Sequence, residues 1–176
     1  MAGVRDVKAA GEPWFRSERI LVRPLRLEDI GPAYAAWFAD PVVRKFIKFA
    51  RAAPSVEDLR LYWREKDADT GADFLGIFDA ATGAHLGNLK FEVGPAPAEA
   101  HVGFLIGDPE ARRRGLLREC LGSCVRAVRA RRGVQRIYLT VDPDNADARA
   151  AFERLGFRPV GAAAEGGDLS MDYHGD

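Results

Sequence analysis

Apolar residues recur along this chain with two different periods, and the change between them predicts the order of its elements. Residues 20–25 alternate between apolar and polar side chains, which is typical of a half-buried strand. From about Glu28 to the pair Asp40-Pro41, apolar residues repeat at helical spacing and predict an amphipathic helix. Residues 42–54 follow neither period, so the pattern assigns them no element.

The rest of the chain predicts a regular series of helices and strands. Ser55 and Asp58 have the spacing of a capping box and predict a helix to about Lys66. Further strands are predicted at 74–78, 85–93, 100–106, 137–141, 158–160 and 168–173, and helices at 115–132 and 145–155. Strands followed by alternating helices and strands predict an α/β sheet with mixed pairing.

The length and composition indicate one globular domain. With 176 residues, 47% hydrophobic and 30% charged, the chain is long enough to bury a substantial core. We expect residues 1–16 to be an N-terminal extension and 17–176 a single domain. A net charge of zero argues against a protein that coats nucleic acid, and no apolar run is long enough to span a membrane. Without a secretory signal at its start, the chain is expected to be cytoplasmic.

Cysteine and histidine usage adds no metal site to this picture. Cys120 and Cys124 lie four residues apart on a predicted helix, so both are expected to pack into the core as small apolar groups. The three histidines, at 85, 101 and 174, do not have the spacing of zinc ligands. We therefore expect no metal.

The stretch from Ala100 to Leu117 combines features that suit an anionic ligand. It predicts a strand, a turn at Asp108-Pro109, three arginines and a glycine, and then the start of a helix. A helix start leaves backbone N–H groups free and carries partial positive charge, which suits a pyrophosphate. Neither GxGxxG nor GxxxxGK[ST] is present. A solvated basic helix end is the alternative interpretation.

Two segments together resemble the GCN5-related N-acetyltransferase (GNAT) superfamily. Arg112-x-x-Gly115-x-Leu117 matches its acyl-CoA pyrophosphate loop, [QR]-x-x-G-x-[GA], except at the last position. Asn145 followed by Phe152-Glu-Arg-Leu-Gly-Phe157 is similar to its second signature. The segment 19–27, RILVRPLRL, resembles the first strand of the branch that includes the ribosomal-protein N-terminal acetyltransferases, and the resemblance covers roughly residues 17–173.

The resemblance implies a fold, a cosubstrate and a set of binding residues. The fold is α/β (α+β): a central, mixed, mostly antiparallel twisted sheet of six to seven strands, with helices on both faces, splayed at the acyl-CoA site. The cosubstrate is acetyl-CoA. Leu117 departs from the small residue of the family, so it either crowds the phosphates or points into the core. The residues expected to bind acetyl-CoA are Phe104, Leu105, Ile106, Arg112, Arg113, Arg114, Gly115, Leu116, Leu117, Asn145 and Phe152.

His101 is the candidate general base. Many members of the family have a glutamate at this position, in an Ala-Glu-Ile pattern, where this chain has Ala100-His101-Val102. Imidazole has an ordinary pKa near 6.5 and accepts a proton at neutral pH. The alternative is a surface histidine at the start of a strand.

The sequence leaves the general acid unassigned. Many members have a tyrosine where this chain has Phe152, and some have a serine where it has Ala148. Tyr138 and Tyr173 are possible substitutes, and nothing in the sequence selects either. Asn145 stands where its side chain either caps a helix or binds the pantetheine arm of CoA.

Residues that contact the acceptor are expected on the first two helices and on the strand at 85–93. These candidates are Trp37, Phe46, Asn88 and Lys90. The strings Trp37–Pro41 and His85–Lys90 are similar to members thought to acetylate amino sugars of surface glycans or flagellar modifications.

These features predict an N-acetyltransferase that moves an acetyl group from acetyl-CoA to a primary amine by direct attack. The amine belongs to a protein N-terminus, an amino sugar or a small molecule, and we expect no nucleic-acid or membrane partner and a monomer or homodimer. Two alternatives remain: a non-catalytic acyl-CoA-binding module, favoured by Leu117 and Phe152, and an RNA-binding protein that uses the arginine-rich helix 112–136.

Overall fold

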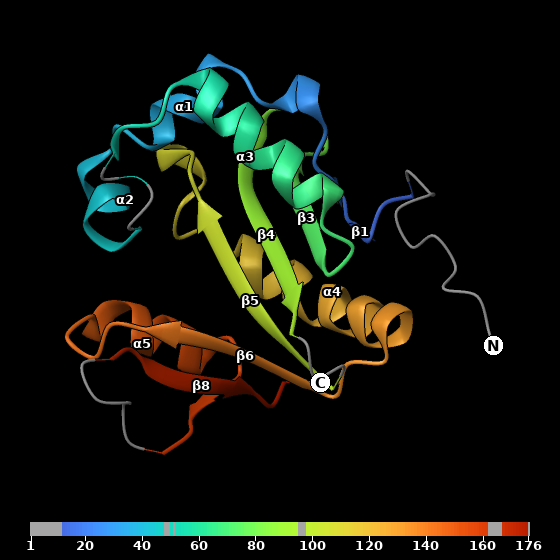
Figure 1. The fold of residues 1–176 in the computed structure, drawn as a ribbon, viewed down its shortest axis with the longest axis vertical. Coiled ribbons are helices and arrows are strands. Elements are labelled where there is room, and N and C mark those ends of the chain that lie inside the picture. The colour runs from blue at the N-terminus through green and yellow to red at the C-terminus, as the bar shows by residue number, and fades with distance from the viewer. Residues whose placement is uncertain (1–11, 48–49, 51, 95–97, 162–166, 176) are drawn as a thin grey trace.

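The computed structural model describes residues 12–47, 50, 52–94, 98–161 and 167–175. Within these residues, eight strands form one sheet in the order β1-β2-β3-β4-β5-β6-β8-β7 (Figure 1). The strands are β1 (Phe15–Arg16), β2 (Ile20–Pro24), β3 (Ala72–Asp79), β4 (His85–Val93), β5 (Glu99–Ile106), β6 (Arg136–Val141), β7 (Phe157–Pro159) and β8 (Leu169–Tyr173). The helices are α1 (Pro32–Trp37), α2 (Pro41–Phe46), α3 (Val56–Ala68), α4 (Leu116–Arg132) and α5 (Ala146–Arg154), with 3-10 turns η1 (Leu27–Asp29) and η3 (Pro109–Ala111).

The sheet is mixed and mostly antiparallel, which confirms the predicted fold class. One pair, β5 with β6, is parallel, and every other neighbouring pair among the described strands is antiparallel. The sheet has one strand more than the six to seven expected, because Phe15 and Arg16 pair with β2. Trp14, just before them, is buried and stacks on Phe91 at a ring distance of 6.2 Å. Ordered structure thus begins before residue 17, and the boundary of the domain stays a prediction.

The sheet splays between its two halves, as the family resemblance implies. β5 and β6 pair at only three positions, from Glu99 with Arg136 to His101 with Tyr138. Beyond these positions β5 stays paired with β4 as far as Ile106, while β6 pairs with β8. The backbone groups on the facing edges of β5 and β6 are therefore freed from strand pairing and are available to a ligand.

Helices cover both faces of the sheet (Figure 1). On one face α4 packs its apolar stripe against β4, β5 and β6, and both cysteines, Cys120 and Cys124, are fully buried in this core as predicted. On the other face α1 and α3 cover a second apolar cluster around Trp37, Phe38 and Leu59. Among the described helices, none combines the length and the apolar character that crossing a bilayer requires.

The first helical region differs from its prediction. The apolar repeat after Glu28 forms the short turn η1 and then α1, instead of one helix. Asp40 and Pro41 end that run as expected, and they also start α2, because the Asp40 side chain accepts a hydrogen bond from the Val42 amide at 2.8 Å. A helix of only six residues shows little periodicity, which explains why the sequence pattern assigned no element to residues 42–54.

Gly107 joins β5 to the arginine loop in a place where no side chain fits. A Cβ added at this position would lie 1.9 Å from Cδ2 of the buried Trp37 ring. We expect Gly107→Ala to lower the free energy of unfolding by about 3 kcal/mol, since the indole cannot yield without disturbing the second apolar cluster. Chemical denaturation measures this change. Gly103→Ala on β5 is the control, because its added Cβ meets no atom within 4 Å, and an equal loss in both variants would contradict the prediction.

Candidate active site

A cavity of about 530 Å³ opens where β5 and β6 diverge. Its lining residues come from segments that are distant in the sequence: α2 and Ile47 after it, β5 and the arginine loop, β6, α5 with its N-cap, and Asp168. Figure 1 shows how these helices and strands are arranged. The splay of the sheet creates this space, so the cavity exists because the β5–β6 pairing stops at His101. The lining includes Val42, Val43, Ile47, the β5 residues 101–106, Arg112, Arg113, the β6 residues 139–141, Asp142, Asn145, Ala148, Phe152 and Asp168.

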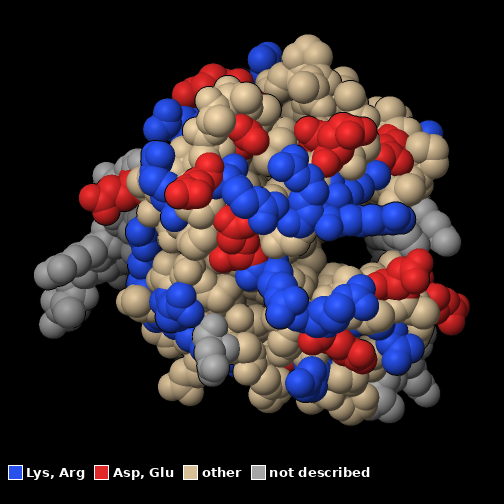
Figure 2. Space-filling view, turned by 180° about the vertical axis from the view of Figure 1, so that it is seen from behind, with Lys and Arg blue, Asp and Glu red and all other residues tan. Residues whose placement is uncertain are grey.

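A second cavity of about 420 Å³ continues the first toward the N-terminus of α4. The two share Ile106 and Arg113, and three arginines line the second one: Arg113, Arg118 and Arg154. Figure 2 shows Lys and Arg side chains on both sides of an opening in this face of the molecule. Together the cavities form a path that is basic at one end and largely apolar toward His101, which suits a long ligand with a phosphorylated end.

The loop between η3 and α4 has a backbone shaped for an anion. Gly115 is the N-cap of α4 with φ +75°, and no side chain caps this helix start. Arg113, two residues earlier, also has a positive φ of +60°. The first turn of a helix leaves its N–H groups without intrahelical partners, so these donors and the positive end of α4 can face a phosphate. This geometry fits the expected pyrophosphate site.

The side chain of Arg112 contacts protein groups, whereas its motif suggests a contact with phosphate. Its guanidinium donates to the carbonyls of Ile106 at 3.1 Å and Gly107 at 2.9 Å, and it pairs with Asp40 at 2.7 Å. Asp40 in turn caps α2 by accepting a hydrogen bond from the Val42 amide. This hydrogen bond, and after it the one from Arg112, holds the pKa of the Asp40 carboxyl below its usual value. The side chain of Arg112 thus fastens the end of β5 to α2, and its charge is neutralised by a protein carboxylate.

Of the other loop residues, Arg114 is bonded to the N-terminal part of the chain, and Leu117 lines the second cavity. The carbonyl of Arg114 accepts a hydrogen bond from Arg19 at 2.7 Å, and Arg19 also pairs with Glu119 of α4 at 3.0 Å. Leu117 packs against the core beneath α4 and lines the second cavity. Leu117 therefore contacts the core and also borders the cavity expected to hold the phosphates, so both interpretations of its departure from the family hold in part.

His101 lies on the wall of the first cavity, on β5 at the last paired position before the splay. Its Nε2 is 3.4 Å from Oγ1 of Thr140, and its ring contacts Tyr138 at 5.3 Å between centroids. Burial lowers the pKa of His101 below its ordinary value; Glu92 opposes this shift and Lys90 adds to it. A neutral imidazole at pH 7 next to the cavity is able to accept a proton from a bound group.

Aromatic and polar residues expected at the cofactor arm do line this cavity. Phe104 and Phe152 meet edge to face at 5.3 Å, one from each side of the splay. Asn145 acts as the N-cap of α5, since its Oδ1 accepts from the Ala148 amide at 3.1 Å. Of the two tyrosines considered as acids, Tyr173 is buried against Phe157, which makes it a core residue.

Of the four residues expected to contact the acceptor, two are buried, one is half-buried beside the site, and the side chain of the fourth lies outside the described part of the structure. Asn88 is buried; its amide donates to the Tyr34 hydroxyl at 2.9 Å, and its Oδ1 lies 2.9 Å from Nε2 of His85. It therefore belongs to a buried polar cluster and does not line the cavity. Trp37 is likewise buried, and its ring packs against Gly107 and His85. The side chain of Phe46 lies outside the described part of the structure. Lys90, half-buried on β4, remains beside the site, opposite Gly103 of β5.

The buried polar cluster around His85 predicts a pH dependence of stability. The ring lies between Tyr34 and Phe78, and burial lowers its pKa despite the contact with Asn88. Because the unfolded chain then binds a proton more readily than the folded one, the free energy of unfolding should fall as the pH drops below about 6.5. Thermal unfolding between pH 7.5 and 5.5 measures this slope. His85→Gln should reduce it and the exposed His174→Gln should not; equal slopes in both variants would refute the assignment.

Sequence reasoning missed several residues of the site. The apolar wall from α2, with Val42, Val43 and Ile47, comes from the segment to which no element was assigned. Thr140 alternates with core residues on β6 and carried no signal beyond that alternation. Arg118 and Arg154 were visible only as arginines on helices, and only the folded structure shows that α4 and α5 both contribute to the lining of one cavity.

Comparison with known proteins agrees with this geometry. Residues 19–158, well over half of the chain, match the family described as the acetyltransferase (GNAT) domain. A mycothiol acetyltransferase from Beutenbergia cavernae is 37% identical over 117 residues, which is 66% of this chain and 38% of that protein. The matched segment thus covers well under half the length of this relative.

Solved structures share the fold at low sequence identity. A RimL ribosomal L7/L12 alpha-N-protein acetyltransferase in complex with coenzyme A superimposes with a TM-score of 0.79 at 17% identity, covering 92% of this chain and 96% of that one. A spermidine N-acetyltransferase SpeG chimera from Vibrio cholerae and hSSAT gives 0.69 at 18% identity, covering 88% and 95%. With its splayed sheet, its uncapped α4 and the match over 19–158, the chain belongs to the GNAT acetyltransferase family.

Proposed function

We propose that this acetyltransferase moves an acetyl group from acetyl-CoA to a primary amine by direct attack, without a covalent enzyme intermediate. The observation that carries the proposal is a pair of neighbouring cavities that share Ile106 and Arg113, one lined by arginines at the start of α4 and the other lined by His101. The basic cavity fits the phosphates of CoA, and the apolar length of the other, between β5 and β6, fits the pantetheine arm. A structure of the same fold was solved in complex with coenzyme A, which supports CoA as the ligand.

The residues of the chain take complementary parts in this reaction. The N–H groups at the start of α4 and the Arg113 side chain hold the phosphates, while Phe104 and Phe152 enclose the arm. Backbone groups freed at the splay hold the thioester carbonyl and stabilise negative charge on its oxygen as the amine attacks. Asn145 fixes the start of α5 beside the arm.

His101 acts as the general base in this proposal. The incoming ammonium loses a proton to His101, directly or through water, and its nitrogen bonds to the carbonyl carbon as the carbon–sulfur bond breaks. His101 releases this first proton to solvent. The nitrogen then loses a second proton to water or to His101, and the departing thiolate takes up one proton from the same source, so that the products are an amide, a CoA thiol and one free proton. The low pKa of His101 keeps the ring neutral and ready to accept a proton at physiological pH.

Cysteine chemistry does not enter this mechanism. Cys120 and Cys124 are buried in the core under α4, and the hydrogen bond between them, followed by burial, raises the pKa of the Cys124 thiol. A buried, protonated thiol is a poor nucleophile. The acetyl group therefore passes to the amine in one transfer.

The class of amine is the open part of the proposal. The relatives are named for a ribosomal-protein N-terminus, spermidine and mycothiol, so a peptide N-terminus, a polyamine and a small amine are the acceptors to test first. A cytoplasmic location and a monomeric or homodimeric state stay predictions.

A thermal-shift series tests the cofactor half of this proposal. A ligand that binds the folded state stabilises it by RT ln(1 + [L]/Kd), about 2.7 kcal/mol at a hundredfold excess over Kd. We expect acetyl-CoA and CoA to raise the unfolding temperature by several degrees, and inorganic pyrophosphate to raise it less. No shift at millimolar acetyl-CoA would contradict the proposal and would favour the RNA-binding alternative, which predicts salt-sensitive RNA binding that CoA does not affect.

A further inference from the structure

His101 and Thr140 meet across the point where the sheet opens. His101 is at the last paired position of β5, opposite Tyr138 of β6. Thr140 lies two residues beyond Tyr138, where β6 no longer pairs with β5, and residues two apart on a strand lie on the same face. Its Oγ1 is 3.4 Å from Nε2 of His101, and both residues line the first cavity. The contact therefore joins the two strands across the splay.

The hydroxyl of Thr140 is available to His101 because the core does not use it. Leu139 and Val141, on either side of Thr140, are buried in the core under α4, whereas Thr140 itself is exposed at the cavity. Among the described residues, His101 is the hydrogen-bond partner of this hydroxyl. A hydroxyl both donates and accepts, so its pairing depends on which ring nitrogen of His101 carries the hydrogen.

The two ring nitrogens of His101 have different surroundings. Nε2 contacts Thr140, while Nδ1 has no hydrogen-bond partner in the described part of the chain. A neutral imidazole has a hydrogen on one nitrogen and a lone pair on the other, and a base needs its lone pair on the nitrogen that is open to the substrate. That requirement puts the hydrogen on Nε2 and makes the oxygen of Thr140 its acceptor. The same bond persists after protonation, because an imidazolium still donates from Nε2.

We propose that Thr140 is the positioning residue of the base: its hydroxyl accepts a hydrogen bond from Nε2–H of His101, so that Nδ1 takes the proton of the acceptor ammonium. In this step an N–H bond of the ammonium breaks, its electron pair stays on the nitrogen for the attack, and the proton bonds to Nδ1, directly or through water. Nδ1 later releases it to solvent. A distance of 3.4 Å is long for this bond, and catalytic hydrogen bonds tighten when substrate binds. This inference rests on the proposed function and adds a residue to the same site.

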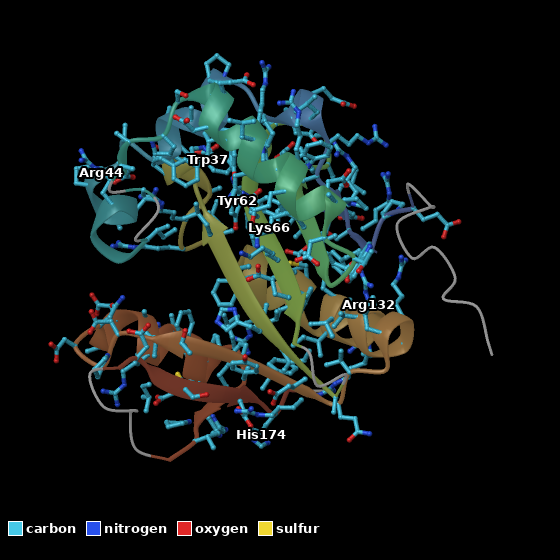
Figure 3. The ribbon with its side chains drawn as sticks, in the orientation of Figure 1. Trp37, Arg44, Tyr62, Lys66, Arg132 and His174 are labelled. Atoms are coloured by element: carbon cyan, nitrogen blue, oxygen red, sulfur yellow. The ribbon has the colours of Figure 1, made fainter. Side chains whose placement is uncertain are left out.

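The charges around His101 stay constant when only Thr140 is changed. The strands and the helix beside His101 carry these charged or titratable side chains on its face of the sheet: Lys66, Lys90, Glu92, Glu99, Arg136 and Tyr138. Figure 3 shows Tyr62 and Lys66 extending from α3 over the face of β4 and β5. Burial lowers the pKa of His101, Glu92 opposes this shift and Lys90 adds to it. A further change of this pKa in a variant that keeps all these groups therefore reports the lost hydroxyl.

Nuclear magnetic resonance of protein with isotope-labelled histidine tests the assignment without a substrate. Proton–nitrogen correlation spectra show which ring nitrogen carries the hydrogen, and a pH titration gives the pKa. We expect the Nε2–H form of His101 in the parent. In Thr140→Val, which keeps the shape and removes the hydroxyl, the pKa of His101 should fall further, because the imidazolium loses an acceptor. Thr140→Ser keeps a hydroxyl and should restore the pKa of the parent.

Rates test the role of this contact in the reaction. The acceptor is a peptide with an alanine N-terminus, spermidine or glucosamine, whichever the parent acetylates fastest. Thr140→Val should lower kcat by about tenfold, the upper range for one hydrogen bond, and leave KM for acetyl-CoA nearly unchanged. The acid limb of its pH profile should move to lower pH, and Thr140→Ser should retain the rate and the profile. Thr82→Val is the control, since it removes a hydroxyl bonded to Asp79 in the β3–β4 turn, outside both cavities.

The outcomes separate this inference from the proposed function. An Nδ1–H ring in the parent, or a pKa of His101 that rises in Thr140→Val, would overturn the inference, because the hydroxyl would then be the donor. A Thr140→Val variant with the rate and the profile of the parent would overturn it too. In these cases a loss of rate in His101→Ala would still leave His101 as the base. If His101→Ala keeps the rate of the parent, His101 is not the base, and the inference fails with that part of the proposed function.

Discussion

Replacing His101 with alanine should lower kcat/KM for acetyl transfer by about 100-fold, the low end of the usual contribution of a general base. The ring lies on the cavity wall next to the splay and within 3.4 Å of the Thr140 hydroxyl. Binding of acetyl-CoA should remain, because its proposed phosphate site lies at the other end of the path. Steady-state rates and calorimetric titration with acetyl-CoA measure the two effects separately.

The pH profile distinguishes a base from a residue that only shapes the cavity. Because burial lowers the pKa of His101, log kcat/KM in the parent should fall on the acid side only below about pH 6.5. In His101→Ala this limb should disappear. His174→Ala serves as the control, since that histidine is exposed and lies outside both cavities. A variant at His101 that keeps the rate and the profile of the parent would show that another group takes the proton.

Arg113→Gln should weaken acetyl-CoA binding by about tenfold, the loss of one charge-assisted contact to a phosphate. Arg113 lines both cavities and lies in the loop that leads into α4, where its φ is positive. The dependence of log Kd on log salt concentration should also become shallower, since one cation fewer meets the phosphates. Calorimetric titration at several salt concentrations measures both effects.

Arg112→Gln is the matched control in the same loop, and its effect should differ in kind. The guanidinium of Arg112 is held by two carbonyls and by Asp40, so its loss should lower the unfolding temperature by about 4 °C and change Kd little. Asp40→Asn should reproduce the effect on stability. If Arg112→Gln instead raised Kd as much as Arg113→Gln, its side chain would be a phosphate ligand, contrary to the contacts described above.

The sequence predicted those parts of the fold that local signals determine. The capping box at Ser55, the strands from β3 to β8 and the long helix α4 all follow from periodicity and cap residues, and the structure has them. The motif residues Arg112–Leu117 and Asn145 predicted which helix starts border the cavities, because a helix start is a local feature. The family resemblance, together with its place at the start of a strand, pointed to His101, and the structure has it on the cavity wall.

Other features depend on contacts between segments far apart in the sequence, which no local pattern carries. Arg112 reads as a phosphate ligand in its motif, but only the packing of α2 beside β5 supplies Asp40 as its partner. Asn88 alternates correctly for a substrate contact, and Tyr34, 54 residues away, buries it instead. The ion pair between Lys66 and Glu92 joins α3 to β4, although the two residues lie 26 positions apart in the sequence.

The most direct test of the central claim is the release of free CoA thiol from acetyl-CoA, measured with and without a primary amine. The family and the geometry predict release that requires the amine and equals the acetylated product, found by mass spectrometry, mole for mole. Tight binding of acetyl-CoA with no amine-dependent thiol release, across peptides, polyamines and amino acids, would contradict the claim and identify the chain as an acyl-CoA-binding module instead.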